Sequence, residues 1–173
     1  MENTLIILAH PNFSLSKSNR LLLESLPEGS NVTIHNIFQS YPDLKIDIAK
    51  EQELLSKYDK IIFQFPTFWF NIPGFLKIWI DEVFTYGWAY GPDGTALNGK
   101  KIGIATTTGG EKSAYSREGI RGFSVEDFLT PVIGSIKYVG ADYIGYVALN
   151  NTYALDEKEV KEAKEAYFKL VLQ

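Results

Sequence analysis

Residues 66–81 read PTFWFNIPGFLKIWID, and this stretch decides the fold. It follows the apolar run 60–65, KIIFQF, which predicts a buried strand. The chain therefore leaves a strand at Pro66, passes through three consecutive aromatic residues and starts a helix at Pro73. Open α/β sheets bind ligands beyond the carboxyl ends of their strands. The aromatic segment at such an end predicts a site for a flat ring with polar edges.

Apolar runs alternate with helix-like segments along the whole chain. The runs that predict strands are 4–9, 32–37, 60–65, 101–106 and 143–149. The segments that predict helices are 19–26, 46–58, 74–84, 125–139 and 156–173. Near-continuous apolar strands separated by helices are typical of a parallel sheet covered on both faces. We therefore predict a three-layer α/β fold and one domain over 1–173, with a five-stranded parallel sheet in the flavodoxin-like order 2-1-3-4-5.

The composition excludes several classes of function. The chain has 173 residues, 45% of them hydrophobic, and a formal net charge of -4. It has no block of Lys or Arg, which argues against nucleic acid as a partner. The absence of cysteine excludes disulfides and thiolate catalysis, and with only two histidines we expect no metal site. We find neither a signal peptide nor a stretch able to cross a bilayer, which predicts a cytoplasmic protein.

Residues 10–19, HPNFSLSKSN, join the first predicted strand to the first predicted helix. Ser16, Ser18 and Asn19 place hydroxyl and amide donors where that helix begins, an arrangement that binds phosphate. The same residues can also act only as helix caps, but beside the aromatic segment we favour phosphate binding. His10 is either a donor to that phosphate or a polar residue at a strand end. No GxGxxG or Walker motif is present, which disfavours a Rossmann dinucleotide site or a P-loop.

Two further segments predict contact with a ligand or a partner. Residues 106–110, TTTGG, follow the fourth strand, where they form an ordinary turn or aim backbone amides at a ligand. In a flavoprotein, such amides stabilise negative charge on the reduced ring. Residues 84–94, FTYGWAYGPDG, predict a ligand cover or a protein interface rather than core. Trp79 has the helical spacing of a core residue, and Lys77 with Asp81 predicts an exposed ion pair.

Together these motifs resemble the NAD(P)H:quinone oxidoreductase family of flavodoxin-like flavoproteins. That family includes DT-diaphorase and short bacterial proteins related to the ancillary proteins of glutathione-gated potassium efflux systems. The resemblance covers nearly the whole chain. Its most specific motifs are the loop 10–19, the segment 66–81, GWAYG at 87–91 and TTGG at 107–110.

The resemblance implies a homodimer with flavin sites at its interface, and FMN as the cofactor with FAD as the alternative. Tyr90 would close each pocket from the partner subunit. The residues that would hold the phosphate side and border the flavin ring are His10, Ser16, Ser18, Asn19, Pro66, Thr67, Phe68, Trp69, Thr107, Thr108, Gly109 and Gly110.

Two more residues are implied in catalysis. Tyr115 falls where the diaphorases carry an active-site tyrosine, although an ordinary surface tyrosine is the alternative. Six residues later those enzymes carry a histidine, and this chain has Arg121. A permanent cation there can stabilise an anionic reduced flavin but cannot readily relay a proton.

The implied activity is ping-pong hydride transfer from NAD(P)H through the flavin to a quinone or a related electrophile. Whether NADH or NADPH is the donor stays open. One alternative is a regulatory flavoprotein that docks on a membrane potassium-efflux transporter. Another is a one-electron carrier of the flavodoxin type, for which a net charge of -4 is mild.

Overall fold

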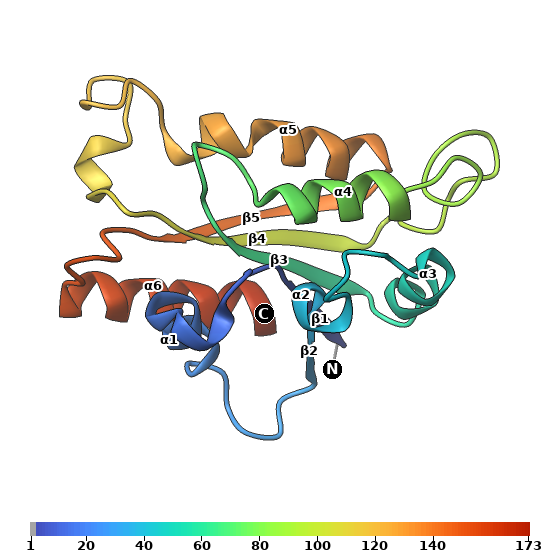
Figure 1. Cartoon of the computed structure of the whole chain (residues 1–173), viewed down its shortest axis with the longest axis horizontal. Helices are drawn as coiled ribbons and strands as arrows, with labels where there is room; N and C mark the ends of the chain where they lie inside the picture. The colour runs from blue at the N-terminus through green and yellow to red at the C-terminus, as the bar shows by residue number, and fades with distance from the viewer. Residues whose placement is uncertain (1–2) are drawn as a thin grey trace.

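The computed structural model describes residues 3–173, and its centre is a five-stranded parallel sheet (Figure 1). The strand order is β2-β1-β3-β4-β5, as predicted. Each predicted strand is confirmed to within one residue at either end. The strands are β1 (Thr4–Leu8), β2 (Val32–Asn36), β3 (Lys60–Pro66), β4 (Lys101–Thr107) and β5 (Asp142–Leu149).

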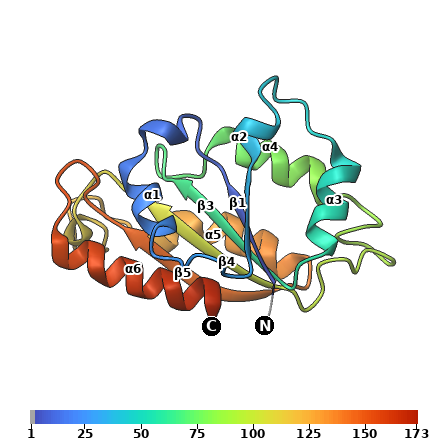
Figure 2. The same cartoon turned by 90° about the horizontal axis from the view of Figure 1, so that it is seen from below.

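Helices cover both faces of the sheet. The α-helices are α1 (Lys17–Leu23), α2 (Ile37–Ser40), α3 (Ile48–Ser56), α4 (Gly74–Val83), α5 (Val125–Tyr138) and α6 (Glu157–Leu172). Short 3-10 turns span Phe13–Leu15 and Lys112–Ala114. Helices α4 and α5 lie on one face, and α1 and α6 lie on the other (Figures 1 and 2). No helix within residues 3–173 is long and apolar enough to cross a membrane.

The short helix α2 was not predicted. Ile37 extends the apolar run of β2 and was expected to end that strand, but it is the first residue of α2. The side chain of Asn36 stops the strand by accepting hydrogen bonds from the amides of Phe38 and Gln39, which caps the helix. Four residues are too few for a helical hydrophobic pattern, so this element left no periodic signal.

Successive side chains along each strand point to opposite faces of the sheet, so they pack into two cores, one on each face. In β1, Leu5 and Ile7 join the core under α4 and α5, and Ile6 and Leu8 join the core under α1 and α6. Trp79 is fully buried in the first of these cores, as expected. The exposed pair of Lys77 and Asp81 on α4 is also confirmed.

The prediction that residues 84–94 lie outside the core is wrong in part. Phe84 and Ala89 are buried, and Trp88 and Tyr90 are half-buried against the same core. Tyr86 is 68% exposed and fits the prediction. The segment looked too glycine-rich for core, but Phe84 meets Trp79 of α4 at 6.1 Å and Tyr90 meets Tyr138 of α5 at 5.7 Å.

A charged residue is buried on the face covered by α4. Glu51 on α3 has no exposed surface, and its carboxylate accepts hydrogen bonds from the Tyr41 hydroxyl at 2.5 Å and from Trp79 Nε1 at 2.9 Å. His35 Nε2 on β2 lies 2.9 Å from the same carboxylate. We call these four residues the Glu51 cluster. It joins the edge strand β2 to α3 and α4.

Candidate functional site

The carboxyl ends of β1, β3 and β4 bring three of the predicted segments to one edge of the sheet. Strand β3 runs between the other two, with Gln64 opposite Leu8 and Pro66 opposite Thr107. The loops that follow these strands lie at the same end of the molecule (Figure 1). The loop 10–16, the segment 66–70 and the segment 107–110 therefore meet where a doubly wound sheet binds its ligands.

The aromatic residues beyond β3 form a tight turn with an unusual backbone. Phe68 and Asn71 exchange two backbone hydrogen bonds, of 2.9 and 3.0 Å, around Trp69 and Phe70. Trp69 has φ 48° and Phe70 has φ 58°, so two bulky residues occupy the left-handed region that favours glycine. Backbone strain of this kind costs about 1–3 kcal/mol per residue and clusters at functional sites. We call residues 68–71 the aromatic turn.

The aromatic turn presents its rings to solvent. Trp69 is 94% exposed, and the rings of Phe68 and Phe70 are partly exposed beside it. The Phe70 ring also meets Phe128 of α5 at 6.1 Å, edge to face. An exposed aromatic cluster on strained backbone gains nothing for folding. The arrangement therefore favours a role in binding a ligand.

The predicted phosphate loop is built partly from groups that bond one another. Ser16 caps α1, because its hydroxyl accepts from the Asn19 amide N–H at 3.4 Å and from Asn19 Nδ2 at 3.2 Å. Asn19 is only 1% exposed, and its Nδ2 also donates to Thr107 Oγ1 at 3.2 Å. These two residues hold the loop against β4. Ser18, in the first turn of α1, is also buried.

His10 can donate a hydrogen bond from this loop in its neutral form. Its Nδ1 accepts from the Asn12 amide at 3.1 Å, so Nε2 carries the proton. Partial burial lowers the pKa of His10 below its ordinary value. The ring is therefore a donor at Nε2 without a positive charge near neutral pH.

Two residues behind the loop were not singled out from the sequence. Gln64 Nε2 on β3 donates to the Asn19 carbonyl oxygen at 3.0 Å, and the Tyr167 hydroxyl of α6 donates to Gln64 Oε1 at 2.5 Å. Burial raises the pKa of Tyr167, so its hydroxyl stays protonated. We call Asn19, Gln64 and Tyr167 the Gln64 network. The polar Gln64 inside an apolar strand was the signal for it.

The segment after β4 is closely bonded to its neighbours. The Thr67 amide donates to the Thr107 carbonyl at 2.9 Å, and the Thr108 hydroxyl donates to Asn150 Oδ1 at 2.8 Å. The Gly110 amide, expected to point at a ligand, donates to the Tyr115 hydroxyl at 3.2 Å.

Tyrosine side chains lie close to the two glycines of this segment. A Cβ on Gly109 would come within 2.9 Å of the Tyr153 ring, and one on Gly110 would come within 3.0 Å of the Tyr115 hydroxyl. The structure thus brings Tyr115 against the glycines of the predicted site. The tyrosine ring packs on Phe128 at 6.0 Å.

Tyr90 and Arg121 lie in different places. Tyr90 belongs to the loop between α4 and β4, at the opposite end of the sheet from the aromatic turn (Figure 1), and it meets Tyr138 at 5.7 Å. Within one chain it does not reach the predicted site. Arg121 precedes α5 and lines a hollow together with Phe70 of the aromatic turn.

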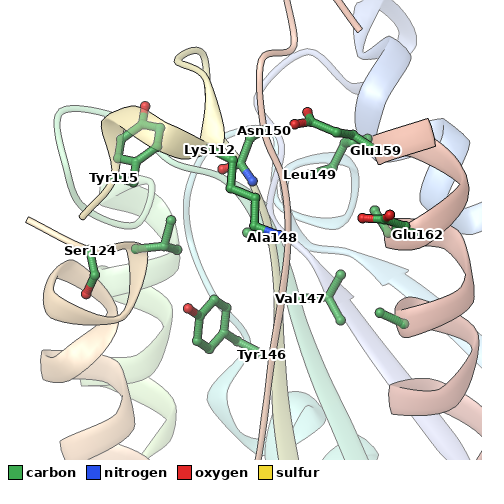
Figure 3. A pocket seen from close by; sticks show the side chains of 13 residues that line it. Lys112, Tyr115, Ser124, Tyr146, Val147, Ala148, Leu149, Asn150, Glu159 and Glu162 are labelled. Carbon is green, nitrogen blue, oxygen red and sulfur yellow. The ribbon is translucent and has the colours of Figure 1, made fainter. Parts of the chain in front are cut away.

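A second hollow, of about 370 Å³, lies beside the edge strand β5 (Figure 3). Tyr115 and Tyr146 lie on its α5 side, and Glu159 and Glu162 project from α6 on the other. Tyr115 is the one predicted site residue that lines it. This hollow therefore stands apart from the edge where β1 and β3 end.

Comparisons with known proteins identify the relatives of this chain. Residues 2–171 match the family model described as a flavodoxin-like fold. A Bacillus subtilis protein called "uncharacterized NAD(P)H oxidoreductase YrkL" is 35% identical over 162 residues, which cover 94% of this chain and 93% of that protein.

Two solved structures are also similar. General stress protein 14 from Treponema denticola, in complex with FMN, is 38% identical with a TM-score of 0.86, and the match covers 97% of this chain and 95% of that one. An NADPH-quinone reductase from P. pentosaceus is 28% identical with a TM-score of 0.89, and the match covers 99% of this chain and 98% of that one.

Proposed function

We propose that this chain, which belongs to the flavodoxin-like fold family, is an FMN-dependent NAD(P)H oxidoreductase that reduces quinones. The aromatic turn carries the proposal, because it holds exposed rings on strained backbone at the edge where this fold binds its ligand. The relatives support it, since one is called an NAD(P)H oxidoreductase, one is an NADPH-quinone reductase and one is a complex with FMN.

The donor set at this edge fits FMN. The neutral His10 ring and the Ser18 hydroxyl supply donors for the phosphate, on a loop held by Ser16 and Asn19. Phe68 and Trp69 supply flat apolar faces for the ring, next to Pro66 and Thr67. The residues at its pyrimidine edge would be Thr107, Thr108, Gly109 and Gly110, of which Gly109 is exposed.

FMN held at this edge would supply the hydride chemistry that links NAD(P)H to a quinone, and the quinone needs one further proton from solvent to become the hydroquinone. The rings of the aromatic turn would offer the stacking surface that orients the two substrates in turn, in a ping-pong order. The Tyr115 hydroxyl accepts from Gly110 and keeps its own proton to donate to a ligand. Arg121 contributes a fixed positive charge.

The proposed assembly is a homodimer in which Tyr90 reaches the site from the partner subunit. Tyr90 lies in the loop between α4 and β4, at the opposite end of the sheet within one chain, so it could meet the site only from a partner subunit. Docking on a potassium-efflux transporter and a cytoplasmic location stay predictions.

The visible spectrum of the purified protein with added FMN tests the cofactor and the reaction together. We expect a flavin spectrum that bleaches with NADPH under anaerobic conditions and returns with menadione. Protein that stays colourless with FMN would contradict the proposal.

A pair of glycine variants tests the aromatic turn. Trp69→Gly should lower kcat/KM for menadione about tenfold, because the ring loses its stacking surface. Leu44→Gly is the matched control, since Leu44 also has positive φ, 60°, but lies in the loop between α2 and α3. An equal loss of activity in both variants would show that the aromatic turn has no specific role in the reaction.

A further inference from the structure

A hollow of about 820 Å³ lies between the aromatic turn and the start of α5. Three of its lining residues are aromatic: Phe70, Phe123 and Phe128. Phe123 is 59% exposed, and the Phe70 ring meets Phe128 edge to face. The volume lies within the range of small-molecule sites. The walls therefore suit a compact aromatic ring system.

The same hollow holds two of the three arginines in the chain, Arg117 and Arg121. Neither has a carboxylate within ion-pair distance in residues 3–173. A guanidinium presents several N–H groups in one plane and binds a carboxylate or a sulfonate through two of them. Two such groups beside aromatic walls fit a ligand that is both aromatic and anionic.

The one acidic residue that lines the hollow is already occupied. Asp127 Oδ2 accepts from the Ser124 amide at 2.8 Å and from the Ser124 hydroxyl at 2.9 Å, where it completes the cap of α5. These hydrogen bonds, with a smaller effect of Arg117, lower the pKa of Asp127, so it stays charged. With two arginines and one carboxylate, the hollow carries one net positive charge in a chain of net charge -4.

We propose that this arginine hollow, lined by Arg117, Arg121 and the phenyl rings, binds aromatic anions that carry a sulfonate or a carboxylate. Such compounds are then favoured electron acceptors over neutral ones of the same ring system. The second statement rests on the proposed function, whereas binding of the anion does not require the flavin.

Calorimetric titration with two isosteric probes measures binding directly. Naphthalene-2-sulfonate carries a charge, and naphthalene-2-sulfonamide does not. We expect the FMN-loaded protein to bind the sulfonate about tenfold more tightly, because only the anion forms an ion pair with the guanidinium groups. Equal affinities for the two probes would overturn the proposal.

Arginine variants test which residues cause the preference for the sulfonate over the sulfonamide. Arg117→Gln should remove most of the preference for the sulfonate, and Arg121→Gln should do the same. Arg20→Gln on α1 is the matched control and should keep the preference, because Arg20 does not line the hollow. A preference that survives both Arg117→Gln and Arg121→Gln would overturn the assignment.

Kinetics with 1,4-naphthoquinone-2-sulfonate and 1,4-naphthoquinone test the acceptor. The ratio of their kcat/KM values in each variant is divided by the ratio in the unmodified protein, so that differences in redox potential cancel. We expect this quotient to fall about tenfold in Arg117→Gln and to stay near one in Arg20→Gln. A quotient near one in both variants would overturn the inference about acceptors.

The same measurements separate this inference from the proposed function. If FMN binds and the neutral quinone is reduced but Arg117→Gln changes no preference, only the inference fails. If the protein stays colourless, the proposed function fails and calorimetry still decides what the hollow binds. If the variants change the ratio of NADPH to NADH efficiency and leave the sulfonate preference intact, the arginines recognise the donor phosphate, and the inference is wrong.

Discussion

The two faces of the sheet each bury one polar network, and the networks differ in charge. Under α1 and α6, the Gln64 network consists of neutral groups and ends at the loop of the proposed site. Under α4, the Glu51 cluster is built around a carboxylate, and none of its members is a predicted site residue. The neutral network adds no carboxylate behind the ligand edge, whereas the charged cluster makes the stability of the fold depend on pH.

The largest effect should come from removing the buried carboxylate. Glu51→Leu leaves the Tyr41 hydroxyl, the Trp79 indole N–H and the His35 ring without their acceptor. Each buried donor without a partner costs about 1–3 kcal/mol, so we expect the free energy of unfolding to fall by about 3–5 kcal/mol. Urea unfolding followed by circular dichroism measures this loss.

Because the Glu51 cluster lies on the other face of the sheet from the Gln64 network, this substitution should leave the ligand edge unchanged. The FMN affinity of folded Glu51→Leu should stay within about threefold of the unmodified protein, a difference below 1 kcal/mol. A large loss of affinity without a loss of stability would show that the two faces are not separate.

A smaller effect is expected from the neutral network. Tyr167→Phe leaves Gln64 Oε1 without its donor and should lower the free energy of unfolding by about 1–3 kcal/mol. Because Gln64 holds the Asn19 carbonyl, FMN should also bind about fivefold more weakly, as measured by flavin fluorescence. Tyr138→Phe on α5 is the control, since Tyr138 is 74% exposed. Unchanged FMN affinity in Tyr167→Phe would show that the Gln64 network does not contribute to FMN binding.

The smallest effect concerns how steeply the free energy of unfolding changes with pH. Burial raises the pKa of Glu51, but hydrogen bonds from His35, Tyr41 and Trp79 outweigh it and hold the pKa below the ordinary value of 4.5. A pKa that is lower in the folded state stabilises the protein above 4.5, and this stabilisation is lost as the pH falls through the folded pKa.

Urea unfolding between about pH 6 and pH 3 tests that slope. The unmodified protein should lose more stability on acidification than Glu51→Gln, which carries no titrating group at this position. Tyr167→Phe should keep the slope of the unmodified protein. Parallel slopes in all three proteins would show that Glu51 titrates as an ordinary carboxylate.

Much of the fold could be predicted, because parallel strands that are buried on both faces have nearly continuous apolar sequences. The runs 60–65 and 101–106 have no polar interruption that repeats with a helical period, and they became β3 and β4. The edge where their loops meet followed from topology alone. The short helix α2 could not be predicted, because a side-chain cap creates it and no hydrophobic period marks it.

The sequence predicted that these segments meet at one edge of the sheet, but not which hydrogen bonds join them, and the residues that bind a ligand stay a prediction. Asn19 was expected as a ligand contact, and the sequence did not reveal that its side chain is buried and donates to Thr107. Glu51 could not be found, because a glutamate in the polar helix sequence IAKEQELLS looks like a surface residue. The positive φ of Trp69 was also invisible, since neither tryptophan nor phenylalanine favours left-handed backbone.

The aromatic turn also gives the protein an intrinsic optical reporter. The chain has three tryptophans, and they occupy three environments: Trp79 has no exposed surface, Trp88 is half-buried and Trp69 is 94% exposed. A collisional quencher such as iodide would therefore reach Trp69 first and leave the emission of Trp79 largely intact. The part of the fluorescence that iodide removes comes from the edge where we place the cofactor, so occupancy there can be followed without attaching a label.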